Sequence, residues 1–153
     1  MTRGTGLLHH VFDHYGPVVQ RQLGQRPNGV LISNGQGDSV AYALWSIEER
    51  GPLFIGSGVR LYEGMIIGEH ARGNDLEVNA LKGKQLTNIR TTSKDEAVRL
   101  TPPRRMSLEQ AIAYIEDDEL VEVTPSAIRL RKRYLDPHER KRFERRVETE
   151  AAA

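Results

Sequence analysis

The 153-residue sequence contains no cysteine. Disulfide bonds, thiolate nucleophiles and cysteine-ligated zinc sites are therefore excluded. No apolar run approaches the roughly 18 residues that a membrane-spanning helix needs. The N-terminal segment MTRGTGLLHH also has too short an apolar core for a signal peptide. We therefore expect a soluble, cytoplasmic protein with one main domain.

Recognisable catalytic motifs are missing as well. The fragment Gly83-Lys84-Gln85 lacks the hydroxyl residue and the earlier glycine of a Walker A loop, so the chain has no P-loop. No G-x-S-x-G elbow surrounds a serine, which leaves a small hydrolase using His70 and Asp75 as a poorly supported alternative. Along a strand, His10 and His14 would lie about 13 Å apart, too far to bind one metal ion. We expect no catalytic residue, metal site, cofactor site or small-molecule substrate in this chain.

Charge, in contrast, is plentiful and unevenly distributed. The net charge is only +1, but residues 71–105 carry eight basic and four acidic side chains, and residues 129–146 carry nine and three. Residues 107–122 carry six acidic side chains and no basic one. Such segregation can build a basic face that binds nucleic acid, although mutually paired, solvated faces explain each block alone about equally well. Within the acidic block, Asp117 to Glu119 predicts a solvated turn rather than a catalytic pair.

Periodicity and turn residues predict short strands in the first two thirds of the chain. The dipeptide Asn34-Gly35 is typical of a hairpin turn, so residues 39–44 are expected to return as the partner of a strand at 30–32. Further strands are expected at 7–12, 53–55 and 62–68, with one helical turn at 45–50. Tyr42 and Trp45 could stack on bases, although core or sheet packing fits them better. Short strands with glycine turns indicate a small barrel or sandwich.

The last third of the chain predicts two helices around a strand pair. Ser107 is a good N-cap and Gln110 completes a capping box before an apolar stripe. Strands are expected at 120–123 and 128–131, and the basic residues of the second should face outward. Pro137 opens a polar helix that extends to Val147, and the three terminal alanines are expected to be disordered.

Several strings of the sequence carry a resemblance to a known family. They are GVLISNGQG from Gly29, AYALW from Ala41, KQLTN from Lys84, SLEQA from Ser107 and DDELVEVTP from Asp117. Together with shorter matches they span nearly the whole chain, which resembles the C-terminal part of the BipA, or TypA, family. Members of that family are ribosome-associated translational GTPases related to elongation factor G.

The resemblance implies an α+β fold in which a small β-barrel-like C-terminal domain carries attached helices and a long basic loop. It places this domain at residues 28–136, with the loop at 71–105, and a basic, partly disordered helical tail at 137–153. Residues 1–16 would be one strand left from a preceding ferredoxin-like domain of the elongation-factor-G type. Residues 17–27 would then be a linker.

The resemblance also implies partners: large ribosomal subunit RNA and the acceptor end of A-site tRNA. GTP and Mg would bind an N-terminal domain that this chain lacks, and the role would be large-subunit assembly or stress-adapted translation. A free-standing RNA-binding barrel is the alternative. The RNA-binding residues implied are Arg72, Asn74, Lys82, Lys84, Gln85, Asn88, Arg90, Arg104 and Arg105, with Arg129, Arg131, Lys132 and Arg133 as a second contact.

Overall fold

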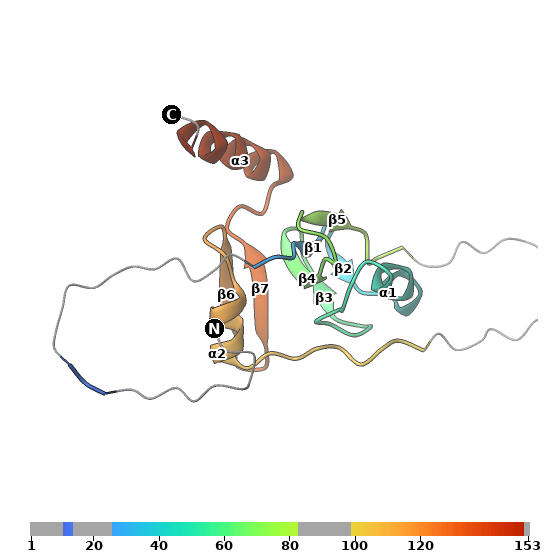
Figure 1. Cartoon of the computed structure of the whole chain (residues 1–153). Coiled ribbons are helices and arrows are strands. Elements are labelled where there is room, and N and C mark those ends of the chain that lie inside the picture. The colour runs from blue at the N-terminus through green and yellow to red at the C-terminus, as the bar shows by residue number, and fades with distance from the viewer. Residues whose placement is uncertain (1–10, 14–25, 83–98, 152–153) are drawn as a thin grey trace, which may run out of the picture.

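The computed structural model of the chain describes residues 11–13, 26–82 and 99–151. These residues form an α+β fold, as predicted, with a five-stranded sheet, a two-stranded sheet and three helices (Figure 1). The elements are β1 (Val30–Ser33), β2 (Gly37–Asp38), α1 (Ala41–Glu48), β3 (Arg60–Leu61), β4 (Met65–Glu69), β5 (Leu76–Val78), α2 (Leu108–Tyr114), β6 (Glu119–Val123), β7 (Ile128–Lys132) and α3 (Pro137–Ala151).

The larger sheet is open and has the strand order β5-β1-β4-β7-β6. Strands β1 and β5 are parallel, and the other neighbours in this sheet are antiparallel. The predicted barrel is wrong for the described residues, because closure would require β5 to pair with β6, and these strands form the two opposite edges. The smaller sheet pairs only β2 with β3.

The core lies on both faces of the open sheet, because strands β1 and β4 carry buried apolar residues at consecutive positions. Alternate residues of a strand point to opposite faces. Leu31, Met65 and Ile67 share one hydrophobic cluster with Leu44 and Ile47 of α1. On the other face, Val30, Ile32 and Ile66 cluster with Ala111 of α2 and Leu130 of β7. Helices α1 and α2 therefore cover opposite faces.

The predicted hairpin after Asn34-Gly35 is wrong. β1 pairs with β4 and β5 instead, and the segment expected to return as a strand begins α1 at Ala41. Ala43, Leu44 and Ile47 are buried at helical spacing, so one face of this segment packs against the sheet. The predicted helical turn at 45–50 is the second half of this helix, which ends at Glu48, before Gly51.

The segment 71–105 is not entirely a loop. Residues Leu76–Val78 form β5, paired in register with Leu31 to Ser33 of β1, and the next buried residue is Ala80. Leu76 and Val78 are the only apolar residues of β5, and two alternating apolar residues are too few to predict a strand from periodicity. Residues 83–98, where four of the predicted RNA contacts fall, lie outside the described residues.

The predictions for the last third of the chain are mostly confirmed. Ser107 caps α2, and both hydrogen bonds of its capping box with Gln110 are present. α3 begins at Pro137 and continues beyond the predicted end to Ala151. Residues 11 and 12, the described part of the strand predicted at 7–12, are not in a strand. Within the described parts of the chain, none of the helices combines the length and apolarity that a bilayer crossing requires.

Candidate nucleic-acid interface

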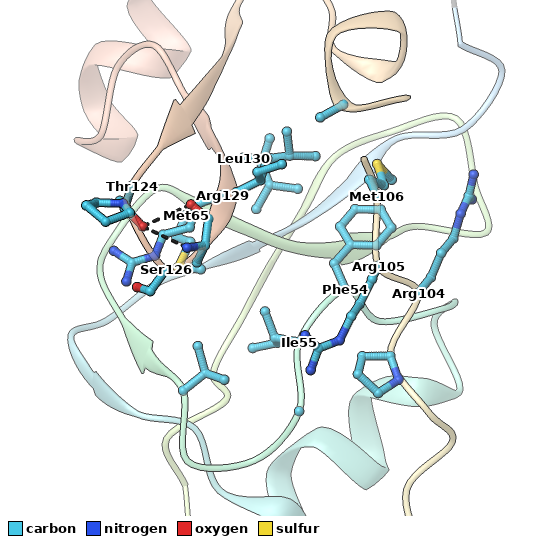
Figure 2. Close-up of a pocket in the computed structure, with 18 residues that line it drawn as sticks. Phe54, Ile55, Met65, Arg104, Arg105, Met106, Thr124, Ser126, Arg129 and Leu130 are labelled. Carbon is cyan, nitrogen blue, oxygen red and sulfur yellow. Dashed lines mark hydrogen bonds between the residues drawn. The ribbon is translucent and has the colours of Figure 1, made fainter. Parts of the chain in front are cut away.

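Three of the predicted RNA-binding arginines line a single pocket. Arg104 and Arg105 belong to the extended segment before α2, and Arg129 lies near the start of β7 (Figure 2). The pocket has a volume of about 510 Å³. It forms where this extended segment meets the loop before β3 and the turn between β6 and β7. Side chains far apart in the sequence are therefore brought to one surface.

The three arginines of this pocket differ in whether they form an ion pair with a carboxylate. The Nη1 of Arg104 lies 3.3 Å from Glu69 Oε2, and its guanidinium lies 6.0 Å from the Tyr114 ring centroid. Arg105 is exposed, and neither it nor Arg129 forms an ion pair with any carboxylate of the described residues. Arg105 and Arg129 therefore present the available positive charge.

A second group of predicted contacts lies in and after the turn at residues 70–75. The backbone of this turn packs on Gly29, where a Cβ would lie 2.2 Å from Asn74 O, and Gly29 N donates to Arg72 O at 2.7 Å. The side chains of Arg72, Asn74 and Lys82 are exposed. The backbone of the turn is thus held against Gly29. The side chains of Arg72, Asn74 and Lys82 remain on the surface, where a phosphate could reach them.

Lys132, one of the predicted contacts, does not lie on the surface. Its side chain is only 3% exposed, because it ends β7 with its ammonium group inside a cluster of carboxylates. The Nζ atom lies 2.5 Å from Asp75 Oδ2, 2.7 Å from Asp118 Oδ2 and 3.1 Å from Glu119 Oε1. An RNA phosphate could reach an ammonium group held in this way only if the cluster opened. Its neighbours Arg131 and Arg133 are half-buried and exposed, respectively.

Glu119 is the centre of this ion cluster and is fully buried. Arg26 approaches it from the other side, with Nη1–Oε2 and Nη2–Oε1 distances of 3.0 and 2.8 Å. Burial by itself raises the pKa of Glu119, but the hydrogen bond from Arg26 and the charge of Lys132 outweigh it and hold the pKa below its ordinary value. Burial likewise lowers the pKa of Lys132, but the charge of Glu119 and the hydrogen bonds to Asp118 and Asp75 raise it overall.

This cluster corrects the prediction that Asp117 to Glu119 form a solvated turn. Carboxylate oxygens of Glu116, Asp118 and Glu119 lie within 4.8 Å of one another, a spacing that could suit a metal ion. Two of the three already accept hydrogen bonds from cationic side chains, so the positive charge that a metal would supply is present in the protein. The group therefore connects Arg26, β6, β7 and Asp75 through ion pairs within the protein. No sequence signal marked Arg26, because its partner lies 93 residues away.

The residues of the hydrolase alternative are also occupied by structural contacts. His70 is buried, and its Nδ1 lies 2.5 Å from Asn74 O. The carboxylate of Asp75 accepts a hydrogen bond from Val30 N at 2.9 Å and pairs with Lys132. No contact joins His70 to Asp75 through their side chains, so they do not form an acid–base pair.

The aromatic pair on α1 is more exposed than expected. Tyr42 and Trp45 are 39% and 51% exposed, and their ring centroids lie 6.2 Å apart. Neither ring lines the pocket. The prediction that both pack in the core or on the sheet is therefore wrong, whereas base stacking by them stays a prediction.

The fold and the pocket together define a small α+β module with a basic, partly apolar surface site. Comparison with known proteins gives its family: the model of the TypA/BipA C-terminal domain matches residues 28–137. The chain is 59% identical over 145 residues to the large ribosomal subunit assembly factor BipA of Escherichia coli K12 and of Salmonella typhimurium LT2, and 55% identical to that of Haemophilus influenzae. The chain belongs to the TypA/BipA family.

These alignments cover 95% of this chain but only 24% of each relative. The chain therefore spans about a quarter of the length of the curated relatives it matches. Its matched part is their C-terminal domain, in agreement with the resemblance found in the sequence strings.

Proposed function

We propose that this chain is the ribosome-binding and tRNA-binding C-terminal module of a BipA/TypA-like translational GTPase, acting in large-subunit assembly or stress-adapted translation in the cytoplasm. Its partners are large ribosomal subunit RNA and the acceptor end of A-site tRNA. The observation that carries this proposal is the 59% identity, over 95% of the chain, to proteins named large ribosomal subunit assembly factors. GTP and Mg bind a domain outside this chain, which itself catalyses no reaction.

The exposed charge supports the RNA-binding part of the proposal. Four predicted contacts are exposed and form no ion pair with a carboxylate of the described residues: Arg72, Lys82, Arg105 and Arg133. A cation of this kind can bind phosphate without first breaking an ion pair, and each phosphate contact releases counterions from RNA. We therefore expect binding that weakens steeply as salt is added.

A charge-reversal variant tests the assignment of the basic segment. Lys82, Lys84 and Arg90 are replaced by Glu, and co-sedimentation with large ribosomal subunits is measured over a series of salt concentrations. Loss of three phosphate contacts should weaken binding and make the slope of log K against log salt shallower by about 2 to 3. Unchanged binding across the series would contradict the assignment.

The matched control reverses three exposed basic residues outside the predicted contacts, namely Arg50, Arg60 and Arg142. It changes the net charge by the same amount. If this control loses as much affinity as the test variant, binding depends on overall charge, and the segment has no special role. The alternative, a free-standing RNA-binding domain, predicts equal affinity for large subunits and for unrelated structured RNA used as competitor.

A further inference from the structure

The pocket that contains Arg104, Arg105 and Arg129 combines an apolar interior with a basic rim. Its apolar lining comes from several parts of the fold, among them the loop before β3 with Phe54 and Ile55, β4 with Met65 and Ile66, and the segment before α2 with Met106. Figure 2 shows Phe54 and Met106 side by side, with Arg105 extending toward Ile55 and Arg129 on the opposite, hairpin side. Ligand pockets commonly have this composition, an apolar lining with a few polar groups.

The walls of the pocket are fixed by backbone hydrogen bonds. Arg104 N donates to Leu53 O at 2.8 Å, which holds the extended segment against the loop. Phe54 N donates to Ile67 O at 2.8 Å. The hairpin wall is closed by hydrogen bonds between Thr124 and Ala127, through both the backbone and the threonine hydroxyl. A ligand would therefore enter a preformed site, at a low cost in chain ordering.

The charge of the pocket has one sign. Its 18 lining residues, all among the described residues, include three arginines and neither Asp nor Glu. Arg104 is partly neutralised by Glu69, whereas Arg105 and Arg129 have no carboxylate partner in the described residues. The ligand that fits is thus an anion with an apolar body.

We propose that this pocket binds one unpaired nucleotide of RNA. The base lies against Phe54 and Met106, and the phosphates on its two sides lie near Arg105 and Arg129. A nucleotide within a strand has a phosphate on each side, which fits arginines on opposite sides of the pocket. This inference rests on the proposed function and adds to it the site and the single-stranded character of the RNA.

An acidic peptide with an apolar side chain has similar overall chemistry, but two features favour RNA. The cations are arginines, whose planar guanidinium groups both bind phosphate at two points and stack on bases. The lining includes an aromatic ring, and proteins that read single-stranded RNA place unstacked bases on aromatic side chains. Phe54 is half-buried and lines the pocket, and its ring meets the Tyr114 ring at right angles, at a centroid distance of 5.5 Å.

Methionine methyl NMR on the full chain tests this inference. The sequence has three methionines, and two of them, Met65 and Met106, line the pocket. Labelled protein is titrated with single-stranded pentanucleotide RNAs, U5 and A5, and signals are assigned with Met106→Leu. We expect the Met106 and Met65 methyl signals to shift with a common dissociation constant.

Two variants should abolish or weaken these shifts. Arg105→Glu with Arg129→Glu removes the rim charge, and should raise the dissociation constant by about tenfold or more. Gly56→Trp adds a large side chain to the pocket lining: Gly56 is a lining residue, its φ is not in the left-handed region, and a Cβ there would meet no atom within 4 Å. The control, Arg50→Glu with Arg142→Glu, carries the same charge change on exposed residues outside the pocket and should bind as the parent does.

Each result decides the inference separately from the proposed function, which is measured by co-sedimentation with large subunits. Methyl shifts that disappear in Gly56→Trp and persist in the control support the nucleotide site. Undisturbed binding of the pentanucleotides by Gly56→Trp overturns it, as does an absence of pentanucleotide binding in a chain that still co-sediments. Shifts produced by an acidic, apolar peptide but not by RNA also overturn it. Loss of co-sedimentation in the parent chain would instead contradict the proposed function.

Discussion

Arg26 and Glu119, 93 residues apart in the sequence, form a two-point ion pair with N–O distances of 2.8 and 3.0 Å. The guanidinium of Arg26 also lies 4.4 Å from the centroid of the Tyr114 ring and donates to the carbonyl oxygens of Tyr114 and Asn28. The chain just before β1 is thus fastened to the end of α2 and to the edge strand β6. This contact places the segment leading into the domain against its core.

Arg26→Lys should lower the free energy of unfolding by about 1 to 3 kcal/mol. Lysine keeps the charge, but it can neither donate at two points to Glu119 nor stack a planar group on Tyr114. The measurement is urea denaturation followed by circular dichroism. Arg50→Lys is the control, since Arg50 is exposed and makes no ion pair with the described residues, and it should change stability by less than about 0.5 kcal/mol. Equal midpoints for both variants would show that the planar group contributes nothing.

Glu119→Ala should be the more damaging change. It removes the one carboxylate that both Arg26 and Lys132 contact, and leaves two largely buried cations with fewer partners. Breaking a buried pair in this way typically costs about 3 to 5 kcal/mol, and the retained contacts of Lys132 with Asp75 and Asp118 place this variant near the lower end. Asp117→Ala, at an exposed position two residues away, is the matched control. A loss below that of Arg26→Lys would contradict the central position of Glu119.

The same cluster gives stability a defined dependence on pH. The pKa of Glu119 is lowered on folding from its ordinary value of 4.5, so its contribution is present above that value and is lost as the pH falls below it. The pKa of Lys132 is raised from 10.5, so its contribution is present below 10.5 and is lost as the pH rises through the folded-state value. The urea midpoint should therefore fall on both sides of neutrality.

Glu119→Gln isolates the acid limb of this dependence. The amide does not titrate, so the urea midpoint of this variant should change less steeply between about pH 5 and pH 3 than that of the parent chain. Parallel acid limbs for the two proteins would mean that other carboxylates control acid unfolding.

Ser107→Ala should cost about 1 kcal/mol of unfolding free energy, because the hydroxyl accepts the Gln110 backbone N–H at the start of α2. Ser57→Ala is a suitable comparison, since Ser57 is exposed and its side chain makes no hydrogen bond in the described residues. A loss of the same size at both serines would contradict a capping role.

Local signals in the sequence were sufficient wherever neighbouring residues determine the structure. The capping box of Ser107 with Gln110, the strands around the turn at Thr124 and the start of α3 at Pro137 all depend on residues within a few positions of each other. The family could also be identified from short strings, because they match at many positions along the chain.

Long-range pairing could not be predicted in the same way. The sequence gives no sign that β1 pairs with β5 in parallel, since β5 has only three residues and half-buried apolar side chains at two of them. Lys132 was misplaced for a related reason. It sits in a run of basic residues that suggests exposure, and the carboxylates that hold it come from Asp75, Asp118 and Glu119, two of which belong to an acidic block that suggests a solvated turn.

The adjacent residues Lys132 and Arg133 should therefore have different roles, Lys132 in folding stability and Arg133 in RNA binding. A pair of substitutions separates the two roles. Lys132→Met removes the cation from three carboxylates and should lower the free energy of unfolding by about 3 to 5 kcal/mol. Arg133→Met changes an exposed residue without an ion pair to the described residues, and should change stability by less than about 0.5 kcal/mol.

For RNA binding, the substitution of Arg133 should have the larger effect and that of Lys132 the smaller. Arg133→Met should make the slope of log K against log salt shallower by about 1 in the large-subunit assay, because one phosphate contact is lost. Lys132→Met, measured under conditions in which circular dichroism shows it to be folded, should leave that slope as it is in the parent chain. A shallower slope for a folded Lys132 variant would mean that the buried ammonium group contacts RNA after all, and the ion cluster would then have to open on binding.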